Sequence, residues 1–190
     1  MTSTTRLLAA LLAGLVLLAA GCGGDDEPEA TSTAGVPFDR AFIDAMVAHH
    51  ESALEMARAA KDAGLSQPDL VEVADAILAT QQEEIDRMKK WRAEWFGSAE
   101  IDPDGAAALG LSESDMGMQH NADALRDSTS VDTDFAQMMI THHQGAIEMA
   151  KLAEEKAEHE ELRELAGEII SAQEREIEIM RPHATGMDHG

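Results

Sequence analysis

The chain has 190 residues, a formal net charge of −23, two Trp, four Phe, no Tyr and eleven Met. This negative charge argues against a nucleic-acid partner and against electrostatic docking on anionic lipid. Because aromatic residues are so few, the core has to be built from Ala, Leu, Ile and Met, which is typical of a helical bundle.

Residues 1–21 predict an export signal. An apolar run of 14 residues, Leu7 to Ala20, follows Arg6, and it is too short to span a membrane but suits a signal peptide. It ends in Leu-Ala-Ala-Gly-Cys at residues 18–22, which resembles the cleavage box of a bacterial lipoprotein. We therefore expect lipid on Cys22 and a lipoprotein attached to the extracytoplasmic face of a membrane through that lipid only. The alternative is a plain secretory signal with an incidental Cys.

Cys22 is the only cysteine, so a mature lipoprotein would have no thiol for catalysis or metal binding. Residues 22–37 are acidic and rich in small residues, which indicates a flexible tether. Residues 38–183 are expected to form one domain, and residues 184–190 a short tail with His and Met.

An internal repeat makes up most of the domain. Residues 42–58 align without gaps with residues 135–151, and 8 of 17 positions are identical. Further along, Gln-x-x-Glu-Ile-x-x-Met occurs at residues 81–88 and again at 173–180. Each copy is too small to bury its own apolar face, so we predict that residues 38–97 and 131–183 pack as two hairpins in an all-α, antiparallel four-helix bundle.

The helix ends have sequence signals of their own. Pro37 and Gly64 suit the start and end of the first helix, and the second is expected to end near Phe96. Ser66 to Asp69 resembles a capping box for the second helix, and Asp132 is expected to cap the third. The fourth helix has to end near Pro182. Within the linker, residues 98–130, we predict one short helix over residues 113–127.

The histidines fall on the apolar face of each repeat. At about 100° per residue, His49 and His50 flank the centre of the arc that holds Met46. Asp44, Glu51 and Glu55 point to the opposite side. In the second copy His142 and His143 flank Met139 in the same way, while Glu148 points away. We predict that the two His-His pairs lie inside the bundle and either meet or occupy symmetry-related sites.

The second helix of each repeat also places polar residues near its inward face. Gln81 and Gln173 lie on the inward arc, and Glu84 and Glu176 lie at its edge, where they are candidate partners of the histidines. Four imidazoles and two amides in a core are costly unless they are satisfied. One hypothesis is that they bind metal; the other is that they form a hydrogen-bonded polar layer that sets the register of the helices.

Methionine accompanies each group of histidines. Met46 and Met139 are predicted metal ligands together with the four histidines, and additional candidates occupy core-compatible positions at Met56, Met88, Met149 and Met180. Inward Met is also an ordinary core residue. Outside the long helices, a linker segment and the tail supply candidate accessory ligands because Met beside Gly in a loop has little reason to pack: Met116, Met118, His120, His183, Met187 and His189.

The pattern Phe-x₃-Met-x₂-His-His-x₂-Ala-x-Glu-Met-Ala, followed by Gln-x₂-Glu-Ile-x₂-Met, resembles the bacterial family called domain of unknown function 305. The resemblance covers residues 38–183. It implies an exported ferritin-like bundle, and copper or silver binding as in some members, with roles for Met46, Met139 and the two His-His pairs.

Three functions remain open from the sequence. The first is an extracytoplasmic lipoprotein that sequesters or transfers copper, as Cu(I), or Ag(I), through His and Met ligands in the bundle core. The second is a ferritin-like di-metal oxidoreductase, which needs inward carboxylates; the third is a structural or interaction bundle without metal. No catalytic residue is predicted. The expected partners are a metal ion, copper or another transition metal, and in addition copper-handling proteins or a second copy of the chain.

Overall fold

The computed structural model describes residues 35–119 and 122–185. The signal sequence, Cys22, most of the tether, His120, Met187 and His189 lie outside these residues. The fold is all-α, as predicted. In chain order the elements are α1 Phe38–Ala63, α2 Pro68–Phe96, α3 Gly105–Leu109, α4 Ala122–Arg126, α5 Val131–Lys156, α6 Glu160–Met180 and the 3₁₀ turn η1 His183–Thr185.

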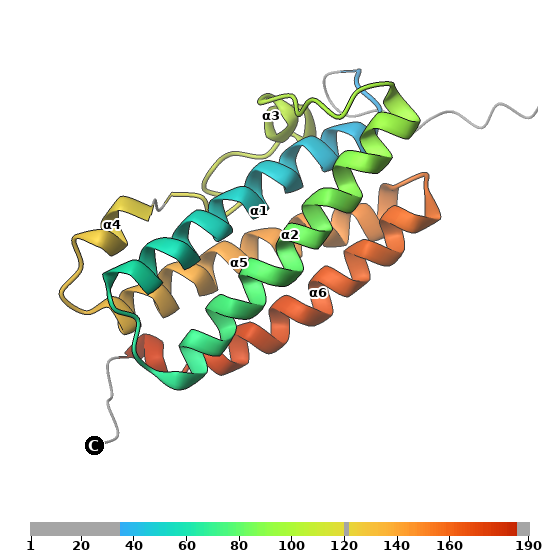
Figure 1. The fold of residues 1–190 in the computed structure, drawn as a ribbon. Coiled ribbons are helices and arrows are strands. Elements are labelled where there is room, and N and C mark those ends of the chain that lie inside the picture. The colour runs from blue at the N-terminus through green and yellow to red at the C-terminus, as the bar shows by residue number, and fades with distance from the viewer. Residues whose placement is uncertain (1–34, 120–121, 186–190) are drawn as a thin grey trace, which may run out of the picture.

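The four long helices form two hairpins, α1 with α2 and α5 with α6, and these pack against each other (Figure 1). Contacts between hairpins join α1 to α5 and α2 to α6. Each helix therefore shares a seam with two others, and the apolar faces of both repeats are buried together. No helix in the described part of the chain is long and apolar enough to cross a membrane.

The predicted ends of α1 and α2 are confirmed. Gly64 adopts φ +101°, and the amides of Gly64 and Leu65 donate back to carbonyls of the last turn of α1, as in a Schellman motif. This left-handed conformation favours Gly over any residue with a Cβ. The α2 helix ends at Phe96, directly before Gly97.

Two aspartates connect the hairpins by hydrogen bonds at the two ends of the bundle. Asp39 of α1 accepts hydrogen bonds from the amides of Glu158 and His159, where α6 begins. Its repeat counterpart Asp132 accepts from the amides of Ser66 and Gln67, where α2 begins. The expectation that Asp132 caps its own helix is therefore wrong. Each carboxylate instead serves the helix start of the other repeat.

Ser66 likewise makes no cap on α2; its hydroxyl donates to Asp132. Although partial burial raises the pKa of Asp132, the hydrogen bonds from Gln67 and Ser66 outweigh it and hold that pKa below its ordinary value. The carboxylate therefore stays ionised and remains an acceptor at neutral pH.

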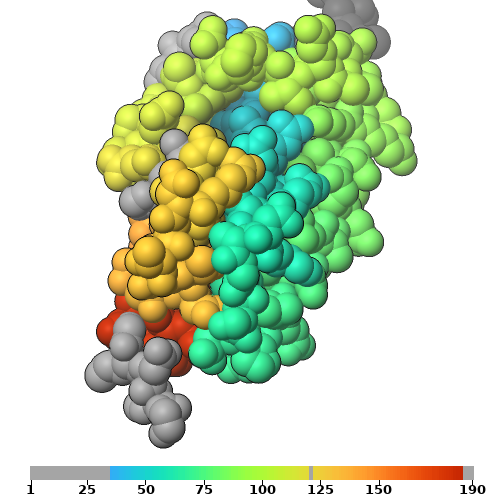
Figure 2. All heavy atoms as spheres, turned by 60° about the vertical axis from the view of Figure 1, so that its left-hand side comes forward, coloured from blue at the N-terminus to red at the C-terminus, as the bar shows by residue number. Residues whose placement is uncertain are grey.

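The linker differs from the single helix predicted over residues 113–127. It holds two one-turn helices, α3 and α4, and both pack on α1. Ser112 and Asp115 do form the reciprocal hydrogen bonds of a capping box, but no helix follows because the chain turns at Gly117, whose φ is +67°. Figure 2 shows linker atoms, yellow-green and yellow, beside the teal surface of α1.

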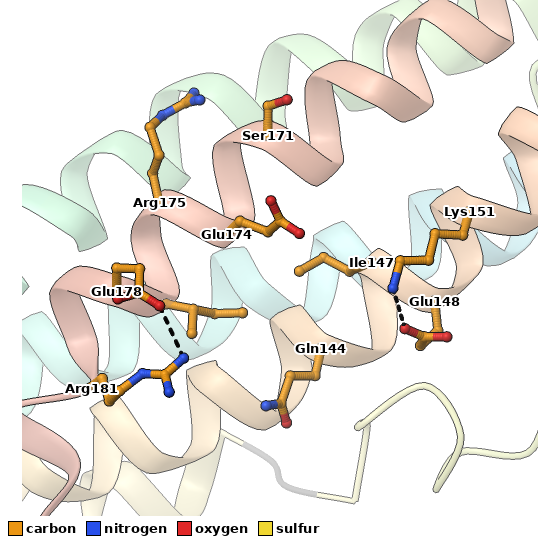
Figure 3. A pocket seen from close by; sticks show the side chains of 10 residues that line it. Gln144, Ile147, Glu148, Lys151, Ser171, Glu174, Arg175, Glu178 and Arg181 are labelled. Carbon is orange, nitrogen blue, oxygen red and sulfur yellow. Dashed lines mark hydrogen bonds and ion pairs between the residues drawn. The ribbon is translucent and has the colours of Figure 1, made fainter.

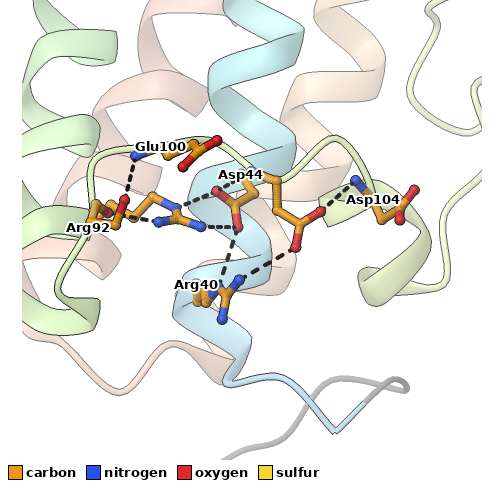
Figure 4. A network of polar contacts seen from close by, with 7 residues as sticks. Arg40, Asp44, Arg92, Glu100 and Asp104 are labelled. Atoms are coloured by element: carbon orange, nitrogen blue, oxygen red, sulfur yellow. Dashed lines mark hydrogen bonds and ion pairs between the residues drawn. The ribbon is translucent and has the colours of Figure 1, made fainter.

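This covering layer changes the environment of Asp44, which was expected to point away from the core. Asp44 does lie on the face of α1 opposite the histidines, but it is only 1 % exposed because the linker covers it. Its carboxylate accepts from Arg92 at 2.5 and 3.1 Å and from the amide of Asp102 at 3.1 Å (Figure 4). Arg92 also donates to the carbonyl of Ser98. A buried ion pair thus fastens the start of the linker to α1 and α2.

Candidate metal centre

The four histidines lie in the middle of α1 and α5, where both helices face the centre of the bundle. None is more than 1 % exposed, and Met46 and Met139, one turn earlier on the same faces, are fully buried. The prediction that both His-His pairs are inside is therefore confirmed. The spacing of three and four residues explains it, because residues so spaced lie on one side of a helix.

The two pairs meet across the seam between α1 and α5. The ring centroids of His49 and His142 are 3.7 Å apart, with 35° between the ring planes. His50 and His143 flank this contact, each 6.4 Å from the neighbouring ring of its own pair. Four imidazoles from both repeats thus form one cluster, which we call the histidine cluster, rather than two separate sites.

Three rings of the histidine cluster are held through Nε2. His49 donates to the carbonyl oxygen of Met116 at 2.9 Å. His50 and His143 bond to the carboxylates of Glu84 at 2.9 Å and Glu176 at 2.6 Å. A carbonyl or carboxylate oxygen accepts the hydrogen bond, so each of these contacts places a proton on Nε2. In a ring that is neutral, the lone pair is then on Nδ1.

Those inner nitrogens have no hydrogen-bond partner among the described residues. The same is true of both ring nitrogens of His142 and of the side-chain oxygens of Gln81 and Gln173. Buried polar atoms are normally satisfied, so a cluster of orphaned lone pairs is an unusual cost. An imidazole held by a carboxylate or carbonyl on one nitrogen and open on the other is how proteins present His to a metal. The donor atoms therefore fit a metal ion.

Burial keeps the centre of the cluster uncharged. Desolvation, and next the charge of neighbouring His50, lower the pKa of His49 to about 3. Desolvation and His49 hold the pKa of His142 well below its usual 6.5. Both rings are therefore neutral at physiological pH, which is the state that binds metal.

We expect metal-free protein to lose stability as the pH falls below 6.5. In that range the unfolded chain binds protons at His49 and His142 that the folded chain does not. Each such group lowers the free energy of unfolding by up to about 1.4 kcal/mol per pH unit. Urea unfolding at pH 7, 6 and 5 measures the slope. The double variant His49→Leu, His142→Leu should have a flatter profile, and equal slopes in both proteins would contradict the assignment.

The methionines fall into two groups. Met56, Met88, Met149 and Met180 are all buried in the core, at most 1 % exposed. Met116 was expected to be an exposed loop residue, and this is wrong: it is 4 % exposed and packs on the core, with Met118 partly buried beside it. In the tail, His183 is partly exposed and lies 3.9 Å from Asp69.

Sequence reasoning missed that the Met116 carbonyl supports His49. The close approach depends on Gly145, because a Cβ there would lie 2.0 Å from the Met116 oxygen. The first repeat has Ser52 at the matching position, so this difference between two otherwise similar motifs was the available signal. It marks a face of α5 that the linker backbone touches at Met116.

Two glutamates face the histidine cluster and two face solvent, as the helical pattern indicated. Glu84 and Glu176 reach the cluster, whereas Glu55 and Glu148 are exposed. Glu148 pairs with Lys151 at 2.8 Å in a hollow of about 770 Å³ between α5 and α6, whose polar rim includes Gln144 and Arg181 (Figure 3). Within residues 35–119 and 122–185, no three His, Cys, Asp or Glu side chains converge closely enough to hold a metal by themselves.

His159, which had no predicted role, is not a lone surface residue. Its ring stacks on Trp95 with centroids 3.6 Å apart, and its Nδ1 lies 2.6 Å from Asp39. It takes part in the contact between Asp39 and the start of α6 at the end of the bundle, and it lies outside the histidine cluster.

Fold and site together define an all-α bundle with a buried cluster of four histidines, whose inner ring nitrogens have no partner among the described residues. The model of the family "Domain of unknown function (DUF305)" matches residues 39–184, and also 20–92, so the chain belongs to this family. Comparison with curated proteins gives no match.

Solved structures of similar fold include metal-bound proteins. CopM in the Cu(I)-bound form is 30 % identical, with a TM-score of 0.66, covering 80 % of this chain and 98 % of that one. CopM in the Cu(II)-bound form is 32 % identical, with a TM-score of 0.66, covering 78 % and 96 %. A putative secreted DUF305 protein from Streptomyces coelicolor is 24 % identical, with a TM-score of 0.67, covering 75 % and 89 %, and bears on the fold alone.

Proposed function

We propose that this protein binds copper in the centre of the bundle and sequesters or transfers it outside the cytoplasm. The observation that carries the proposal is the set of buried, unpartnered imidazole nitrogens in the histidine cluster. Similarity to CopM, whose structures include Cu(I)-, Cu(II)- and Ag-bound forms, supports a metal-binding role.

The chemistry of the donors favours a soft ion. Imidazole accepts Cu(I), Cu(II) and other transition metals, whereas a neutral thioether favours Cu(I) and Ag(I) and contributes little to Fe(II) or Mn(II). Met46 and Met139 are the thioethers nearest along the chain to the histidines, three residues before His49 and His142. Among the described residues, no three His, Cys, Asp or Glu side chains are placed to hold a metal ion by themselves, so binding requires these thioethers or a small movement of side chains.

Changing Met46 and Met139 to Leu tests the proposal. Leu keeps nearly the same volume, so the free energy of unfolding should fall by less than about 1.5 kcal/mol per site. Cu(I) affinity should fall by about tenfold or more, and Cu(II) affinity much less, because the imidazoles remain. Competition titrations with Cu(I) under reducing conditions and with Cu(II) in air measure the difference.

Substituting Met56 and Met149 by Leu tests the second group of candidate ligands for comparison, because these residues occupy equivalent positions six residues beyond His50 and His143. Because they lie farther along the helix from the histidines, we expect a smaller loss of Cu(I) affinity than in the Met46/Met139 variant. Equal losses of Cu(I) and Cu(II) affinity in the Met46/Met139 variant would argue against thioether ligation.

Two observations argue against the alternative functions. A ferritin-like di-metal oxidoreductase needs several carboxylates at the metal, and only Glu84 and Glu176 reach the cluster, each already bonded to a histidine. A structural polar layer leaves no reason for the orphaned nitrogens, since the function of such a layer is to satisfy its members.

We further propose that the chain is a lipoprotein with lipid on Cys22. The support is the sequence of residues 7–22 alone, because these residues lie outside the described part. Cys22→Ser should move the protein from the membrane fraction to the soluble fraction or the medium. Fractionation of cells expressing each form measures this, and an unchanged distribution would contradict lipidation.

A further inference from the structure

The two repeats differ at the surface above the histidine cluster. The second helices of the repeats, α2 and α6, correspond with an offset of 92 residues, so Glu84 matches Glu176. Both carboxylates hold a buried histidine and both reach water to the same small extent, with 14 % and 13 % of the side chain exposed. Each therefore stands between solvent and one edge of the cluster.

On the Glu84 side, the seam between α2 and α6 is bridged. Arg87, one turn after Glu84, donates to Glu168 of α6 at 2.8 Å. The guanidinium also lies over the ring of Trp91, 5.3 Å from its centroid, which holds it in place. This ion pair spans the two helices beside the carboxylate.

On the Glu176 side the same two positions are Ile179 and Ala76, which cannot pair. A pocket of about 340 Å³ is found here, lined by Asp69, Glu72, Val73, Ala76, Glu176 and Ile179. Ile179 is 43 % exposed, although it is a large apolar residue. Glu176 lines this pocket, and its carboxylate lies 2.6 Å from Nε2 of His143, so one residue contacts both the pocket and the histidine cluster.

We propose that this pocket is the port through which a monovalent metal cation reaches the histidine cluster, with Glu176 as its first protein ligand. The inference rests on the proposed function. Asp69 and Glu72 at the rim supply negative potential, but the other end has Glu161 and Glu164 at the matching positions. The missing ion pair, not the charge, distinguishes the port. Coordination by a carboxylate oxygen of Glu176 and then by Nδ1 of a neutral His143 ring forms coordination bonds only and breaks no covalent bond.

The chain offers a reciprocal exchange as a test. Ala76→Glu with Ile179→Arg installs the ion pair of the other side, and Arg87→Ile with Glu168→Ala removes that pair. Both exchanges leave the net charge unchanged and affect no proposed ligand. The probe is Ag(I), supplied as the ion alone to the full-length chain and followed by stopped-flow competition with a chromogenic chelator.

Closing the port should slow Ag(I) binding and release by the same factor, about tenfold, and leave the dissociation constant unchanged. Opening the other side should accelerate both rates. Thermal unfolding of each variant, expected within a few degrees of wild type, confirms that the bundle is intact.

Unchanged rates in both exchanges would overturn the port while leaving the proposed function standing. A change in the dissociation constant without a matched change in both rates would also overturn it, because the exchanged residues would then belong to the site. If wild-type protein shows no Ag(I) binding that depends on the four histidines, the proposed function itself fails.

Discussion

Replacing His49, His50, His142 and His143 together by Leu is expected to abolish tight binding of Cu(I), Cu(II) and Ag(I). All four rings belong to one cluster, so removing them leaves the core without an imidazole donor, and affinity should fall by more than about 100-fold. Competition titration with each ion, followed by metal content after gel filtration, measures the loss.

The same variant should fold. It removes a buried polar layer whose inner nitrogens are unpartnered, and replacing such groups with apolar side chains is often neutral or stabilising. The carboxylates of Glu84 and Glu176 keep a little exposure, so they remain in contact with water when their histidines are gone. Far-ultraviolet circular dichroism and urea unfolding check the fold independently of metal.

A suitable control is His159→Gln, which removes a histidine from the end of the bundle and should leave Cu(I) affinity unchanged. If the four-Leu protein bound Cu(I) as tightly as wild type, the cluster would be a structural layer. Any copper would then belong to the segment around Met116 and Met118, or to the tail.

The inward residues could be predicted because a helix repeats its faces regularly. Met46, His49 and His50 share an arc in any α-helix, and the second copy repeats the arc at Met139, His142 and His143. The repeat also predicted which faces meet, since two hairpins with one apolar face each have to bury both faces together.

Helical periodicity could not predict that the linker covers a second face of α1, the face opposite the core. No helix or strand was predicted for residues 98–112, and residues 113–118 were wrongly predicted to be helical, yet this segment buries Asp44 and brings the Met116 carbonyl to His49. These are tertiary contacts made by a loop, and a helical wheel treats every residue opposite the core as exposed. Asp39 and Asp132 were missed for the same reason, because their partners lie in the other repeat.

The covered face leads to the second large expected effect. Asp44→Ala should lower the free energy of unfolding by about 3–5 kcal/mol, because it leaves the Arg92 charge buried without its partner. It also removes the acceptor of the Asp102 amide and so loosens the linker. Urea unfolding at pH 7 with metal-free protein measures the loss.

Two further variants show whether the cost of Asp44→Ala comes from leaving the Arg92 charge buried or simply from losing an ion pair. In Asp44→Leu with Arg92→Met both charges are gone, so the loss should be much smaller than in Asp44→Ala. Glu148→Ala breaks an ion pair of similar length that is exposed to solvent, and it should cost less than about 1 kcal/mol. If Asp44→Ala cost no more than Glu148→Ala, the linker would not shield Asp44 from water, and the second covered face of α1 would contribute little to the stability of the bundle.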